Sequence, residues 1–144
     1  MRIALRNVVV LDSNLIVSAF LNPKSVAAQA LSIGLEHFSV ACSQETFAEL
    51  VDVLARDKFD KYVSKAARAA LLELYAQSVL FFDAPVTVAD CKDPKDNKFL
   101  ALALVAEAKV IVSGDKKDLL VMNPYKGIEI IGLRAFVEGY ARHT

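Results

Sequence analysis

The sequence predicts an α/β domain with a mostly parallel sheet of four to five strands flanked by helices. Residues 8–11 and 110–112 are continuous apolar runs rich in β-branched residues. Such runs are typical of strands that a parallel sheet buries on both faces. Segments with helical character separate the expected strands along the chain, which favours βαβ connections over hairpins.

Local signals set the expected boundaries of these elements. Ser43 and Ser64 are suited to cap the helices that follow them, Pro94 after Asp93 favours the start of another helix, and Gly34 is expected to close the second helix. The expected strands cover residues 6–11, 38–42, 79–82, 110–112 and, as an edge strand, 128–131. The expected helices cover residues 15–21, 25–33, 43–54, a segment from Ser64 that includes Leu71, Leu72 and Tyr75, residues 94–108, a short helix containing 118–120, and 133–140.

Composition and charge narrow the possible functions. The 144 residues suit one domain, and 17 basic residues balance 17 acidic ones. A nucleic-acid site must then be a local patch or be bridged by metal. Two cysteines without a CxxC pair and only two histidines disfavour a zinc site. The longest apolar run, residues 99–106, is well short of the roughly 20 residues of a membrane span, so we expect a soluble, cytoplasmic protein.

Two aspartates stand where expected strands end. Asp12 directly follows residues 8–11, and Asp115 follows residues 110–112 after two small residues. Ligands of open parallel sheets bind beyond the carboxyl ends of the strands, so these two carboxylates are candidates for one site. The alternative is that each aspartate only starts a turn or caps the next helix.

Further acids belong to two expected helices. Asp96 falls in the first turn after Pro94, with Asp93 placed as the cap, so its alternative role is helix capping. Glu49 shares one helix face with Glu45 and Asp52, and such a face is usually only solvated. A bound cation would relieve the repulsion among these like charges.

Clustered carboxylates favour Mg²⁺ or Mn²⁺, because these hard ions prefer oxygen ligands. Such ions activate water and stabilise a leaving oxygen in phosphodiester hydrolysis. The phosphate-loop pattern GxxxxGK[ST] is absent, and no serine–histidine–aspartate set stands out. A phosphorylated receiver domain is a third alternative, but the expected acidic pair and the late strand-end lysine are missing.

At this point the residues resemble the PIN domain, especially the small bacterial PIN proteins that are toxins of toxin–antitoxin pairs. The resemblance spans residues 8–120 and rests on four segments: Val9-Val10-Leu11-Asp12-Ser13-Asn14, Ser43 with Glu49-Leu50, residues 93–100 (Asp-Pro-Lys-Asp-Asn-Lys-Phe-Leu), and residues 112–120 (Val-Ser-Gly-Asp-Lys-Lys-Asp-Leu-Leu). It implies an α/β/α sandwich and a Mg²⁺- or Mn²⁺-dependent ribonuclease. By position, the metal-binding acids would be Asp12, Glu49, Asp96 and Asp115, with Asp118 as a possible fifth and with Asn14, Ser113 and Asp93 in support.

The same resemblance implies partners. It suggests a homodimer and a small antitoxin that covers the acidic pocket and inserts an Arg or Lys among the carboxylates. Residues 15–21 and 25–33, with Ala27, Ala28, Ala30 and Leu31, would offer the apolar surface. Single-stranded RNA is the expected substrate, gripped by Lys98, Lys116 and Lys117, while Lys58 and Lys61 follow the Glu49 helix. The rival interpretation is a PIN-like module that docks a partner but cuts nothing.

Overall fold

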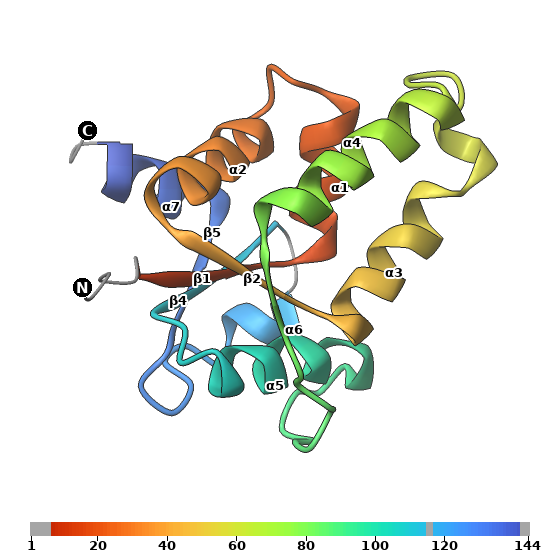
Figure 1. Cartoon of the computed structure of the whole chain (residues 1–144). Coiled ribbons are helices and arrows are strands. Elements are labelled where there is room, and N and C mark those ends of the chain that lie inside the picture. Colours follow the sequence, from red (N-terminus) through yellow and green to blue (C-terminus); the bar gives the residue numbers. More distant parts are fainter. Residues whose placement is uncertain (1–6, 115–116, 142–144) are drawn as a thin grey trace, which may run out of the picture.

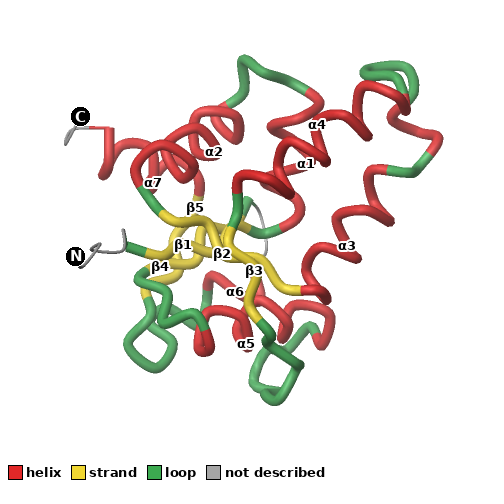
Figure 2. The backbone as a smooth tube through the Cα atoms, viewed as in Figure 1, coloured by secondary structure: helices red, strands yellow, loops and turns green. Residues whose placement is uncertain are grey.

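The fold is known from a computed structural model that describes residues 7–114 and 117–141. Its centre is a five-stranded sheet in the order β3-β2-β1-β4-β5, in which every neighbouring pair is parallel (Figures 1 and 2). The predicted α/β class is therefore confirmed, and residues 8–11 and 110–112 lie on neighbouring strands. The strands are β1 (Val8–Leu11), β2 (Ser39–Ser43), β3 (Leu80–Phe82), β4 (Val110–Ser113) and β5 (Glu129–Gly132).

Helices cover both faces of the sheet. In Figure 1, α1, α2, α4 and α7 lie on one side and α5 and α6 on the other, while α3 runs out from the end of β2. None of the helices within the described residues is long and apolar enough to cross a membrane. The helices are α1 (Ser13–Leu21), α2 (Val26–His37), α3 (Gln44–Leu54), α4 (Lys65–Ser78), α5 (Asn97–Val105), α6 (Lys117–Leu120) and α7 (Leu133–Ala141), with short 3₁₀ turns η1 (Asp57–Phe59) and η2 (Pro94–Asp96).

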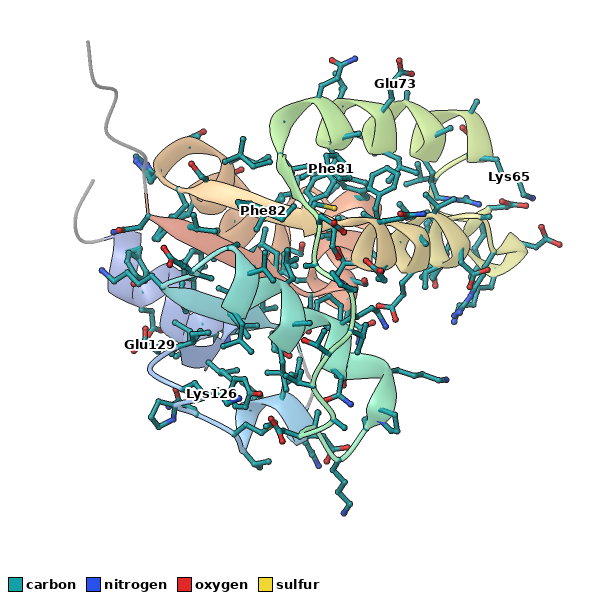
Figure 3. The ribbon with its side chains drawn as sticks, turned by 60° about the horizontal axis from the view of Figure 1, so that its bottom comes forward. Lys65, Glu73, Phe81, Phe82, Lys126 and Glu129 are labelled. Carbon is teal, nitrogen blue, oxygen red and sulfur yellow. The ribbon has the colours of Figure 1, made fainter. Side chains whose placement is uncertain are left out.

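The core has two parts, one on each face of the sheet. Val9 packs into the cluster under α1, α2 and α7, whereas its neighbour Val10 packs into the cluster around α5. The edge strand β3 follows the same alternation: Phe81 meets Phe47 of α3, and Phe82 packs against the α5 side (Figure 3). Successive strand residues point to opposite faces, so a sheet covered on both sides needs the continuous apolar runs that the sequence shows.

Two predicted helix ends are wrong. The second helix does not close at Gly34 but continues to His37, and Gly34 is buried inside it, facing the side chains of Leu11 and Val40. The helix α5 ends at Val105 instead of 108, because Glu107 adopts a positive φ of 52° that an α-helix cannot contain.

The predicted serine caps are confirmed, and a buried arginine completes the connection between the two helices concerned. Ser43 caps α3 and Ser64 caps α4 through backbone N–H groups three residues on. Arg68 of α4 is 1% exposed. Its guanidinium donates to the carbonyls of Leu54, Val63 and Arg56 and to the carboxylate of Asp60, so it fixes the corner of residues 54–63; the distances from Nε to Leu54 and from Nη2 to Arg56 are 2.7 and 3.1 Å.

Candidate active site at the carboxyl edge of the sheet

The candidate site begins where β1 and β4 end side by side. Leu11 is paired with Val112 in the parallel ladder, and the N–H of Asp12 donates to the carbonyl of Val112 at 3.1 Å. This register sets Asp12 beside Ser113, although 101 residues separate them in sequence. Each of these two strands, which are apolar on both faces, therefore places one polar side chain at the carboxyl edge of the sheet.

Asp12 is completely buried, and within the described residues its carboxylate accepts hydrogen bonds from Leu15, Ser113 and Gly114. Oδ1 accepts from the N–H of Leu15 at 2.9 Å, which caps α1. Oδ2 accepts from Ser113 Oγ at 2.7 Å and from the N–H of Gly114 at 3.0 Å. Asp12 therefore caps a helix, as the alternative interpretation expected, and the capping hydrogen bond also fixes the direction of its carboxylate at the candidate site.

Asp96 is the second buried carboxylate, with 1% of its surface exposed. It ends the turn η2, which Asp93 caps by accepting from the N–H of Lys95 at 3.0 Å. Within residues 7–114, Asp96 makes no side-chain capping bond to α5. Helix capping therefore does not explain why this acid is buried, and a carboxylate at such depth requires compensating hydrogen bonds or cations.

Glu49 lies in α3 and is bonded to a lysine near the start of α5. Its Oε2 lies 2.6 Å from Lys98 Nζ, and the two side chains are 23% and 13% exposed. Lys98 Nζ also donates to the carbonyl of Lys95 and lies 5.4 Å from the ring centre of Phe99. The ammonium of Lys98 is thus engaged within the protein and ties α3 to the start of α5. The third acid of the predicted face, Asp52, is instead exposed and pairs with Arg56 at 3.6 Å.

Cys91 lies among the acids, although the sequence suggested only a small buried hydrophobe. Its Sγ donates to the carbonyl of Asp118 at 3.5 Å. Burial raises the pKa of this thiol, the Asp93 backbone opposes that, and the carboxylates of Asp96, Asp118 and Asp93 raise it further. Asp96 and Asp118, the latter in the first turn of α6, thus both act on the Cys91 thiol.

Asn97 is a second residue that the sequence analysis missed. It is 5% exposed, and its Oδ1 accepts from the N–H of Cys91 at 2.8 Å. This bond holds the loop before Asp93 against the start of α5. In the sequence, Asn97 is marked only by its position directly after Asp96, and an asparagine after an aspartate is too common to indicate a functional role.

The remaining predicted site residues are placed as follows. Asn14 is exposed in α1, next to Gly114, and Lys117 is exposed at the start of α6. Asp115 and Lys116 lie outside the described residues. Without Asp115, the described part of the chain contains no group of three or more His, Cys, Asp or Glu side chains that could hold a metal ion.

The donor chemistry nevertheless fits a hard divalent cation. Asp12, Asp96 and Glu49 offer only carboxylate oxygens, which Mg²⁺ and Mn²⁺ prefer. Two of these acids are almost completely buried, where positive charge is most effective in stabilising them. Asp118 is among the described residues and completes no group of three with them, so Asp115 would have to be a member of any such set.

Comparison with known proteins agrees with this geometry. A family model of the PIN domain matches residues 8–117. Uncharacterized protein MJ1680 of Methanocaldococcus jannaschii is 30% identical over 131 residues, which cover 88% of this chain and 83% of the relative.

Solved structures share the fold at low sequence identity. VapBC2 from Rickettsia felis, bound to a DNA fragment from its promoter, superposes with a TM-score of 0.59 at 15% identity over 87% of this chain and 98% of that chain. PAE2754 from Pyrobaculum aerophilum gives 0.60 at 18% identity over 94% and 90%. FitAcB from Neisseria gonorrhoeae gives 0.56 at 21% identity over 88% and 98%.

Proposed function

Because the chain belongs to the PIN domain family, we propose that it is a metal-dependent endoribonuclease that acts in the cytoplasm as the toxin of a toxin–antitoxin pair. The observation that carries this proposal is the buried carboxylate of Asp12, oriented by Ser113 and Gly114 at the carboxyl edge of two central strands. Asp96 ends the turn η2 before α5 and Glu49 lies in α3, and the proposal assigns both carboxylates to this site.

Each acid has a distinct part in this proposal. Asp12, Glu49, Asp96 and Asp115 would hold Mg²⁺ or Mn²⁺, with Asp118 as a further ligand. The ion, when bound, supplies an activated water and stabilises charge on the phosphate. Ser113 and Gly114 are positioning groups, because their hydrogen bonds fix the direction of the Asp12 carboxylate.

Lys98 is better explained as a counter-ion of the site than as a grip on RNA. Its ammonium lies on the Glu49 carboxylate and is only 13% exposed. When a metal ion binds, the Glu49 carboxylate would either bind the ion and Lys98 together or release Lys98. The arrangement also supports the idea that a cationic side chain of an antitoxin could occupy the same carboxylates.

A small antitoxin and a second copy of the chain are the proposed partners. The support is that similar folds occur in structures titled as VapBC and FitAcB. The expected apolar surface needs correction, because Ala27 and Ala30 are buried in the core. Ala28 and Leu31 instead line a groove of about 410 Å³ beside Tyr75, between α1, α2 and α4.

The test is cleavage of single-stranded RNA by the purified chain with Mg²⁺, with Mn²⁺ and with a chelator. Asp96→Asn keeps the shape of the side chain but removes its charge. We expect this variant to lose Mn²⁺ binding in calorimetry and to lose cleavage. Its urea midpoint should stay unchanged or rise, since carboxylate repulsion is relieved.

Two outcomes would contradict the proposal. A fully active Asp96→Asn variant would exclude this acid from the site. A chain that binds an antitoxin tightly but neither binds Mn²⁺ nor cuts RNA would support the rival function, a PIN-like protein-binding module.

A further inference from the structure

A groove of about 360 Å³ opens next to the Asp12 edge. Asn14 and Gly114 form its wall on the side of the site, and the N–H of Gly114 is one of the groups that hold the Asp12 carboxylate. The opposite wall consists of Arg56, Lys58 and Phe59 from the corner between α3 and α4. The groove is therefore continuous with the proposed active site.

The chemistry of this wall suits a nucleic-acid strand. Lys58 Nζ lies 5.1 Å from the ring centre of Phe59, so a cation and an aromatic face are presented together. Arg56 adds a guanidinium whose pairing with Asp52, at 3.6 Å between exposed side chains, is weak in water. Proteins hold single strands with such cations for the phosphates and aromatic rings for the bases.

The wall is also held in place before any ligand arrives. The buried guanidinium of Arg68 donates to the carbonyls of Leu54, Arg56 and Val63, which lie before and after the turn η1. The acids of this corner, Asp57 and Asp60, both lie 2.7 Å from Lys65 Nζ, and Asp60 also lies 3.0 Å from Arg68 Nη2, so two cations balance the two acids. Arg56 and Lys58 consequently remain as the cations that face the groove.

We propose that this groove holds the single-stranded RNA next to the cleaved bond, with Lys58 and Arg56 on its phosphates and the Phe59 ring beside a base. The inference rests on the proposed nuclease function. It replaces Lys98, which is bonded to Glu49, as the grip on the strand.

The chain itself offers a matched control for Lys58. Lys61 lies three residues on, and its Nζ is also 5.1 Å from an aromatic ring centre, that of Tyr62. Lys61 is exposed but does not line the groove. Lys58→Gln and Lys61→Gln therefore remove the same charge from the same kind of pair, and only the first touches the proposed strand path.

The experiment measures binding of a labelled single-stranded oligoribonucleotide by fluorescence anisotropy at several salt concentrations, in the full chain silenced by Asp96→Asn. Lys58→Gln should weaken binding and flatten the slope of log affinity against log salt by about 0.7. Lys61→Gln should change neither quantity. In the active chain, Lys58→Gln should raise KM with little effect on kcat, because Lys58 holds the strand without touching the reacting atoms.

The outcomes separate the groove from the function. If the active chain cuts RNA but Lys58→Gln and Lys61→Gln give equal affinities and slopes, the groove is not the strand path and the inference is overturned alone. If the chain neither binds nor cuts single-stranded RNA, the proposed nuclease function is overturned and the groove with it.

Discussion

Replacing Asp12 should unfold the protein more easily as well as silence it. The carboxylate caps α1 through Leu15 and accepts from Ser113 and Gly114. Loss of a helix cap costs about 1 kcal/mol, and a buried N–H left without an acceptor costs about 1–3 kcal/mol. Asp12→Ala should thus lower the free energy of unfolding by about 2–4 kcal/mol.

Asp12→Asn is the sharper variant, because one amide oxygen replaces two carboxylate oxygens. That oxygen can accept from Leu15 or from Gly114, but not from both, since the amide NH₂ must face the other donor. We expect a loss of about 1–3 kcal/mol. Relief of carboxylate repulsion opposes this loss, but we expect the hydrogen bonds from Leu15, Ser113 and Gly114 to dominate.

Urea unfolding in chelator, followed by circular dichroism, measures the effect without metal. With a slope of about 2 kcal/mol per molar urea, a loss of 2 kcal/mol lowers the midpoint by about 1 M. Ser18→Ala, at an exposed position of the same helix, is the control and should stay within about 0.5 kcal/mol of the parent. An Asp12→Asn midpoint equal to or above that of the parent would refute the reasoning.

Three further predictions follow from the charges. Joint replacement of Lys116 and Lys117 by Gln should flatten the salt dependence of RNA binding without moving the cut site; an unchanged slope would exclude both from the strand path. Arg68→Lys should cost about 2–3 kcal/mol in urea unfolding, because an ammonium cannot reach all the carbonyls that the guanidinium serves. Burial, and then its 2.5 Å bond to Asp90, raise the pKa of Tyr125 to about 12, so the folded state favours the neutral phenol. That stabilisation is complete below pH 10 and disappears as the pH rises through 12; the difference in urea midpoint between the parent and Tyr125→Phe should therefore shrink over this range, and a constant difference would contradict it.

Much of the fold could be predicted because its strands carry an unambiguous signal. Runs such as residues 110–112 can be buried only between two layers, and that fixes both the class and the central position of the strand. Gly34 was misjudged because local rules treat glycine as a helix end, whereas here it allows α2 to pack closely on Leu11 and Val40. Packing between α2 and the strands decides that Gly34 lies inside the helix, and a local sequence pattern carries no information about that packing.

Sequence position pointed to the acids of the candidate site, whose metal-binding role stays a prediction, but it did not point to the hydrogen-bond and ion-pair partners of these acids. Position after a strand pointed to Asp12, while the pairing of Glu49 with Lys98 depends on how α3 meets α5. The sequence did contain a signal for one residue that the analysis missed, Arg68. Arg68 stands on the same helical stripe as Leu72 and Tyr75, and a cation at that spacing indicates a buried role.

The distance in sequence between Asp12 and Ser113 determines how late in synthesis the candidate site can form. The strand β1 emerges early from the ribosome, but β4, its neighbour at the site, is among the last strands to be synthesised. A nascent or truncated chain that ends before residue 110 lacks both groups that hold Oδ2 of Asp12. An unfinished copy therefore cannot fix the Asp12 carboxylate as the folded chain does, and under the proposed function it would not yet cut RNA.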